Sequence, residues 1–210
     1  MTAPGERPKV GVLFPHAGER VWTASSMMLA LTLLAVGVAS VVYSSLFEWA
    51  LHRFVMHRPV GPFTYPYRSH AITHHGTFGS AKDYHIQPEV DPHLVTMAWW
   101  NGPVLLLINA PTGLLAWWIT GSWAATAVFM GVMTSYYIAY EYFHWCMHVP
   151  GPRWFQGTRV FKWVDRHHRL HHLEPMRNLN VVLPVADYLL RTRLARAPQP
   201  PVPQDAVPTT

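Results

Sequence analysis

The sequence predicts an all-α integral membrane protein, with three or four transmembrane helices and a cytoplasmic cap of histidine-rich helices. Two uncharged stretches predict the spans: residues 21–47 and 94–140 contain no Asp, Glu, Lys or Arg, and each exceeds the roughly 20 apolar residues that cross a bilayer as a helix. Most of the histidines lie in the segments that follow these stretches. Charged residues make up 13% of the chain, about half the usual share for a soluble protein, which disfavours buried core helices as the explanation.

The apolar stretches set the limits of the spans. We expect the first span at about 23–47. The second stretch is long enough for two spans, at about 94–118 and 122–143, with a break at residues 120–122. A break at residues 110–113 would leave only about 15 residues before it, which is short for a span.

These spans imply one membrane domain, at residues 23–196. Residues 1–22 are expected to lie outside the cytoplasm as a retained segment, because no small-residue cleavage site marks a secretory signal. Residues 197–210 are rich in proline and are expected to form a disordered tail. Cys146 is the only cysteine, so no disulfide can form within the chain.

Three spans place all histidine-rich segments on one side of the membrane. Of the 16 Lys and Arg residues, thirteen lie on that side, and the positive-inside tendency therefore makes it cytoplasmic. A fourth, re-entrant segment would change this assignment. The net charge of +5 fits attraction to anionic headgroups, whereas nucleic-acid binding is disfavoured because the basic residues form no separate domain.

The histidines are the strongest functional signal. Eleven of the 14 fall within residues 52–75 and 144–172. Neutral imidazole binds borderline metals, and its ordinary pKa of roughly 6.5 leaves little competition from protons near neutral pH. Ten ligands exceed the four of a tetrahedral ion, so two metals sharing the nitrogens is the economical interpretation. The predicted ligands are His52, His57, His70, His74, His75, His144, His148, His168, His171 and His172.

Helical spacing explains part of this pattern. Residues three or four apart share one face of an α-helix, so we expect His144 and His148 to point the same way. For the same reason we expect His168, His171 and His172 to converge on one ion.

His57 and His75 do not fit α-helical spacing. Each follows a partner histidine by five residues, which is about 140° around an α-helix. Pro59 and Gly76 lie just beyond them and favour the end of a helix. We therefore expect the chain to turn at these positions and swing each ring toward its partner.

Polar residues near the motifs are candidates for orienting the ligand rings. Glu48 and Glu141 precede ligand histidines by four and three residues, and we expect hydrogen bonds to the rings rather than direct ligation. Asn180 and Asp187 are further candidates for the last cluster. The four remaining histidines are expected to lie at the interface: His16, His85, His93 and His167.

The motifs resemble those of the fatty acid hydroxylase and sterol desaturase superfamily, which are integral membrane, non-haem di-metal oxygenases. The second motif departs from the commonest pattern, with three residues instead of two between its first histidine and the histidine pair. The resemblance is therefore weaker at His70 than at His74 and His75. The stretch 178–188 also looks like the family's tail, and the resemblance covers about residues 45–193. The matching motifs are at 52–57, 70–75, 144–148 and 168–172.

This resemblance implies an O₂-dependent oxidoreductase with two iron ions, which hydroxylates an unactivated C–H bond of a membrane lipid, foremost a fatty acyl chain. Zinc is the alternative metal in the isolated protein. Carotenoid hydroxylation and sterol or lipid desaturation are the alternatives within the superfamily. The resemblance implies no catalytic residue beyond the metal ligands. It also implies a separate electron-transfer protein of the ferredoxin, rubredoxin or cytochrome type.

A histidine-rich membrane metal transporter is the alternative from a different class. A transporter would place polar ligands within its spans. In this chain the histidines cluster outside the predicted spans, so the oxidoreductase is preferred.

Overall fold

The computed structural model describes residues 24–79 and 83–197. Every regular element in these residues is a helix, and one isolated β-bridge joins Val60 and Phe63. The predicted all-α class is therefore confirmed. The interpretations of residues 1–22 and 198–210, and of His16, concern positions outside the described residues.

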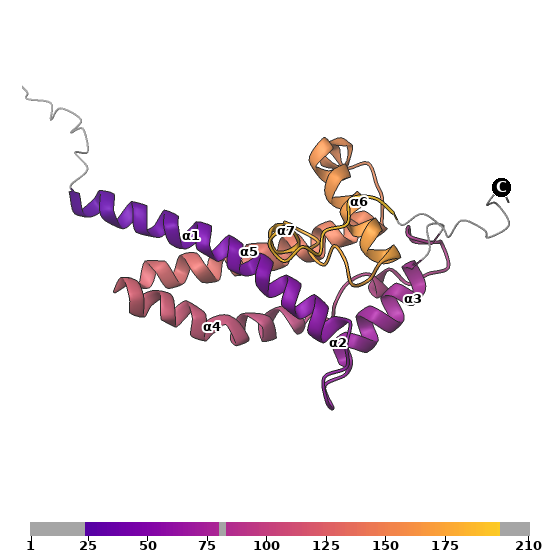
Figure 1. The fold of residues 1–210 in the computed structure, drawn as a ribbon, viewed down its shortest axis with the longest axis horizontal. Coiled ribbons are helices and arrows are strands. Elements are labelled where there is room, and N and C mark those ends of the chain that lie inside the picture. Colours follow the sequence, from indigo (N-terminus) through magenta and orange to yellow (C-terminus); the bar gives the residue numbers. More distant parts are fainter. Residues whose placement is uncertain (1–23, 80–82, 198–210) are drawn as a thin grey trace, which may run out of the picture.

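Three long helices lie side by side and form the elongated body of the molecule (Figure 1). The central one, α5, packs against both of the others. These helices are α1 (Ala24–Leu51), α4 (Asn101–Thr120) and α5 (Trp123–His148).

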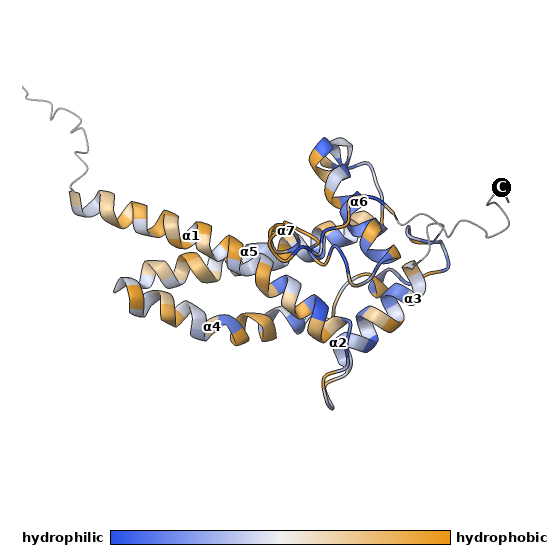
Figure 2. Cartoon of the chain, in the orientation of Figure 1, coloured by the Kyte–Doolittle hydropathy of each residue, from blue (hydrophilic) through white to orange (hydrophobic). Residues whose placement is uncertain are grey.

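Two helical stretches are long and apolar enough to cross a membrane, namely Ala24–Met56 and Asn101–Thr120. Only 6% and 17% of their most apolar windows are buried, which differs from the core helices of a soluble protein. Within residues 24–79 and 83–197 no other helix meets this criterion, α5 included. Figure 2 shows the hydrophobic colouring along α1 and α4, and more hydrophilic colouring at the other end of the molecule.

The second long helix begins at Asn101 and not near residue 94. A short 3-10 helix, η3 (Pro92–Leu94), and a turn precede it. The backbone amides of Met97 and Ala98 bond to the Glu141 carboxylate and the Tyr65 hydroxyl. These amides are thereby satisfied by side chains of other elements instead of by a helix.

The turn between α4 and α5 lies at residues 121–122, where the break was expected. Gly121 has a φ of 67°, in the left-handed region, and its N–H bonds to the carbonyl of Trp117. This is the usual way for a glycine to end a helix. It turns the chain back into an antiparallel helical hairpin.

The remaining helices form a cap at the opposite end of the bundle from this turn (Figure 1). Two of them, η1 and η2, are π-helices, in which the backbone bonds join residues five apart. The cap consists of η1 (His52–Met56), α2 (Tyr65–Tyr67), η2 (Arg68–His74), α3 (His75–Phe78), η4 (Trp154–Gly157), α6 (Arg159–Leu173) and α7 (Val185–Leu189).

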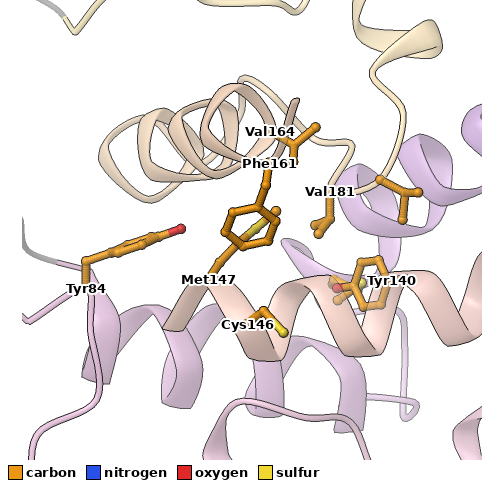
Figure 3. Close-up of a cluster of buried hydrophobic side chains, with 9 residues drawn as sticks. Tyr84, Tyr140, Cys146, Met147, Phe161, Val164 and Val181 are labelled. Carbon is orange, nitrogen blue, oxygen red and sulfur yellow. The ribbon is translucent and has the colours of Figure 1, made fainter. Parts of the chain in front are cut away.

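A small apolar core fixes α6 above the end of α5. Phe161 and Val164 of α6 pack with Cys146 and Met147 of α5 (Figure 3). Thr158 caps the start of α6 by accepting a hydrogen bond from the Phe161 amide. Burying an apolar side chain contributes about 1.5–3 kcal/mol, so this contact holds the histidines of α6 over those of α5.

Candidate metal centre

The ten predicted ligand histidines lie together in two groups of five. In each group, one nitrogen from every ring lies within 4.8 Å of the others, and each group could hold a metal ion. The first cluster is His52, His57, His70, His75 and His171; the second cluster is His74, His144, His148, His168 and His172.

The nitrogen–nitrogen distances test whether a metal fits. Neighbouring Nε2 atoms are 2.8–3.3 Å apart in the first cluster and 3.0–3.1 Å apart in the second. For a metal–nitrogen bond of about 2.1 Å, ligands at right angles lie about 3.0 Å apart and tetrahedral ligands about 3.4 Å apart. These distances fit nitrogen donors that share one ion, and each cluster offers five such donors instead of four.

Backbone carbonyls fix which ring nitrogen faces the centre. Nδ1 of His74, His148 and His171 bonds to the carbonyls of Leu94, Tyr84 and Arg177, at 3.2, 2.6 and 2.9 Å. His52 does the same with Leu179. Since a neutral imidazole has one donor and one acceptor nitrogen, Nε2 of each of these rings presents a lone pair. Lone pairs that converge in this way are stabilised by a bound cation.

The imidazoles of the clusters are held in the neutral form. Burial lowers the pKa of His57 to about 4 and the pKa of His148 to about 4. Burial, and then the neighbouring His57, lowers the pKa of His171 to about 3. The lone pairs are therefore free for a metal at neutral pH.

The π-helices bring the histidines that lie five residues apart onto one face. In η1 the His57 amide bonds to the His52 carbonyl at 3.1 Å, and in η2 the His75 amide bonds to the His70 carbonyl. The predicted helix end before Pro59 is present, because η1 ends at Met56, but the predicted end at Gly76 was wrong, because α3 continues to Phe78. At both positions the wider π-helical turn aligns the rings. The extra residue in the second motif is what this wider turn requires, and His70 lies within the first cluster.

Each pair of adjacent histidines is divided between the two clusters. His171 belongs to the first cluster, whereas His168 and His172 belong to the second. The prediction that these three converge on one ion was therefore wrong, since His171 lies about 100° around the helix from His172. His74 and His75 are divided in the same way. The clusters consequently lie side by side, and the rings of His75 and His172 stack at 4.3 Å.

The acidic residues do not orient the rings directly. Glu48 accepts hydrogen bonds from Tyr136, from the Asn180 side chain and from the Val181 amide. Glu141 accepts one from the Met97 amide. The expected bonds from these carboxylates to histidine rings are thus replaced by the backbone carbonyls. Residues outside the motifs supply those carbonyls, and any residue type can do so, because each has a backbone carbonyl.

Asp187 and Asn180 contact the backbone segment that orients His52, and not a ligand ring of either cluster. Asp187 accepts hydrogen bonds from the amides of Leu179 and Asn180, and the Leu179 carbonyl bonds to His52. Burial alone would raise the pKa of Asp187, but hydrogen bonds from groups such as His167 outweigh burial and lower it. The prediction that His167 is interfacial was wrong, because it is buried against this carboxylate at 3.0 Å.

Tyr84 is a residue of the site that sequence reasoning missed. Its carbonyl accepts from His148, and its ring lies against three rings of the second cluster, with centroids 4.6 Å from His148, 6.1 Å from His168 and 5.4 Å from His172. Tyr84 lies on a loop outside the helical spacing of the motifs. Only the fold brings it to the cluster.

An apolar cavity of about 100 Å³ opens between α1, α4 and α5. Its walls run from Ser44 and Met133, deep in the bundle, to Met56 and Tyr140 at the cap. Tyr140 stacks on His144 of the second cluster, with ring centroids 5.6 Å apart. The stretch of α5 from Met133 to Tyr140 covers two turns, about 10 Å. The cavity therefore extends from the candidate spans to Tyr140, whose ring separates it from His144 of the second cluster.

The chain was compared with known protein families, curated proteins and solved structures. No protein-family model, curated protein or solved structure matches the chain. The arrangement of the residues therefore supplies the argument about function.

Proposed function

We propose that this chain is an O₂-dependent membrane oxidoreductase that holds two iron ions and hydroxylates an unactivated C–H bond of a fatty acyl chain. The observation that carries this proposal is the pair of adjacent five-imidazole clusters at the end of an apolar cavity. A structural metal site has no need of such a cavity, and an apolar pocket has no need of ten imidazoles. Their contact through Tyr140 and His144 supports a site where a bound chain meets bound metals.

Five nitrogen donors favour iron over a structural zinc ion, which takes four. The first ion would be held by His52, His57, His70, His75 and His171, and the second by the other five histidines. When bound, the two irons supply the oxidising chemistry: RH + O₂ + 2e⁻ + 2H⁺ gives ROH + H₂O. Each ion would be held by five imidazoles of this chain, and O₂ would be the co-substrate.

The protein positions the substrate and excludes water. The cavity offers an apolar chain a lining that includes Val104, Leu105 and Ile108 of α4. Tyr140 forms the wall beside His144, so the segment of chain next to it is the one exposed to oxidation. Desaturation begins with the same removal of hydrogen and is the alternative outcome of this geometry.

The proposed topology has three spans, with the cap on the cytoplasmic side. α1 and α4 are the two candidate spans, and α5 returns from α4 through the turn at Gly121 alongside both. The membrane then covers the cavity, and a lipid reaches it without passing through water. A metal transporter fits less well, because the ten histidines lie in the cap helices and at the C-terminal end of α5, at one end of the bundle (Figure 1).

Isotopic labelling tests the reaction. The chain, loaded with iron in phospholipid vesicles and supplied with a chemical reductant and ¹⁸O₂, should produce hydroxylated acyl chains that carry one ¹⁸O atom, as measured by mass spectrometry. Met133→Trp fills the cavity and should reduce product at least tenfold without loss of iron. The matched control is Ile138→Trp, on an exposed face of the same helix, and it should retain activity.

Two results would contradict the proposal. One is O₂ uptake without labelled lipid, and the other is metal flux across the vesicles without any O₂ uptake. Equal product from Met133→Trp and Ile138→Trp would remove the cavity from the reaction.

A further inference from the structure

The outer face of α6 carries four cations. They lie three, four and three residues apart, so they follow one line along the helix. Three of them are exposed, and the fourth has 39% of its side chain exposed. We call these four residues the cation stripe: Arg159, Lys162, Arg166 and Arg169.

The cation stripe lies across the helix from the metal centre. The buried face of α6 bears His168, His171 and His172, which belong to the two clusters. An α-helix with its side chains is about 10–12 Å thick. A molecule bound at the stripe is therefore separated from the ligand rings by a single helix.

A continuous line of packed groups connects the stripe with the second cluster. The guanidinium of Arg169 lies over the Tyr84 ring, 4.2 Å from its centroid. The Tyr84 ring in turn lies against His148, at 4.6 Å. The Tyr84 hydroxyl donates to Asp165 at 3.1 Å, and Arg169 Nε donates to the other oxygen of this carboxylate at 2.9 Å.

We propose that the cation stripe is the docking surface for a small acidic one-electron carrier protein, and that electrons enter the metal centre at the second cluster. This inference rests on the proposed function, which consumes two electrons in each turnover. In each encounter the carrier is oxidised by one electron and the centre is reduced by one. Opposite charge on the carrier steers it to the stripe and fixes its orientation.

An acidic protein fits the stripe better than a lipid surface does. A helix that lies in headgroups buries its apolar face in the membrane, but α6 buries Phe161, Val164 and Leu170 within the protein and leaves the separated residues Val160, Trp163 and Leu173 exposed. The segment around α7 exposes consecutive apolar residues. There Leu189 and Leu190 are exposed, and basic residues follow them directly in the sequence.

Binding of two acidic carriers tests the docking surface. The probes are a plant-type [2Fe–2S] ferredoxin and a rubredoxin, each added to the full chain in neutral detergent at low salt. We expect at least one to bind the natural chain, with affinity that falls as salt rises. Lys162→Glu combined with Arg166→Glu should weaken this binding at least about tenfold, because attraction becomes repulsion. The matched control, Arg191→Glu with Arg193→Glu, makes the same change in net charge near α7 and should bind within about twofold of the natural chain.

Three outcomes would overturn the inference. In the first, neither carrier binds the natural chain. In the second, the two double variants bind the carriers equally. In the third, the stripe variant loses binding to anionic phosphatidylserine vesicles but still binds the carriers. A different result would contradict the proposed function: the natural chain would form no hydroxylated lipid even when a chemical reductant supplies the electrons. With that reductant the stripe variant should form product at the natural rate, while its carrier-driven rate falls.

Discussion

The two histidine clusters reach similar donor sets from different backbones. The first cluster uses two π-helices, where His52 and His57, and His70 and His75, lie five residues apart. The second uses α-helical spacing of four residues in α5 and α6. The first includes two half-buried rings, His57 and His75, whereas all five rings of the second are buried.

This difference shows that spacing alone does not define a metal site. A π-helix has a wider turn than an α-helix, so residues five apart can share a face. Adjacent residues point in different directions, so His74 and His75, at the junction of η2 and α3, serve different clusters, as do His171 and His172 of α6. Two neighbouring sites can therefore be built from the same segments.

The largest expected effect comes from removing a ligand of the buried cluster. His148→Ala should abolish product formation and lower the metal content from two ions per chain toward one, because the second cluster loses a donor fixed by the Tyr84 carbonyl. Metal analysis of membranes and a product assay measure this. Insertion into the membrane should be unchanged. His93→Ala, which removes an exposed histidine outside both clusters, is the control, and full activity of His148→Ala would exclude His148 from the site.

A smaller effect is expected when the pH is lowered, which should reduce the free energy of unfolding of the metal-free chain. Burial lowers the pKa of His57 from 6.5 to about 4, so between these values the unfolded chain binds a proton that the folded chain does not. Stability is therefore full above pH 6.5 and falls as the pH drops toward 4, by up to about 3 kcal/mol for a shift of this size. Thermal unfolding of the chelator-treated chain across this range measures it. Bound metal should reduce the loss above pH 4, and a flat profile for the metal-free chain would contradict the neutral, buried state of the rings.

The smallest effect is expected from shortening a π-helix. Deleting Phe54, whose side chain is 47% exposed, leaves His52 and His57 four residues apart, and an ordinary α-helical turn then places them on one face. We expect metal content and product within about twofold of the natural chain. Inserting one alanine between His144 and His148 is the matched comparison. It breaks the spacing of four in the second cluster and should remove most of the activity. If the deletion and the insertion reduce activity equally, the difference between π-helical and α-helical spacing of the histidines has no effect on function.

The sequence by itself determined the helical class, the two candidate spans and the identity of the ten clustered histidines. It could do so because these features depend on local properties: a run of apolar side chains satisfies a helix in lipid, and a concentration of imidazoles is visible without coordinates. The turn near Gly121 is equally local, since a glycine in the left-handed region ends the helix there.

Only the tertiary structure decided how the histidines are divided and what orients them. The assignment of His171 and His172 to different clusters depends on the direction of each ring relative to three other segments. The carbonyls of Tyr84 and Leu179 are made partners by folding, and every residue type carries such a carbonyl. The path from Arg169 through Tyr84 likewise joins residues 85 positions apart, a distance along the chain that no local pattern can span.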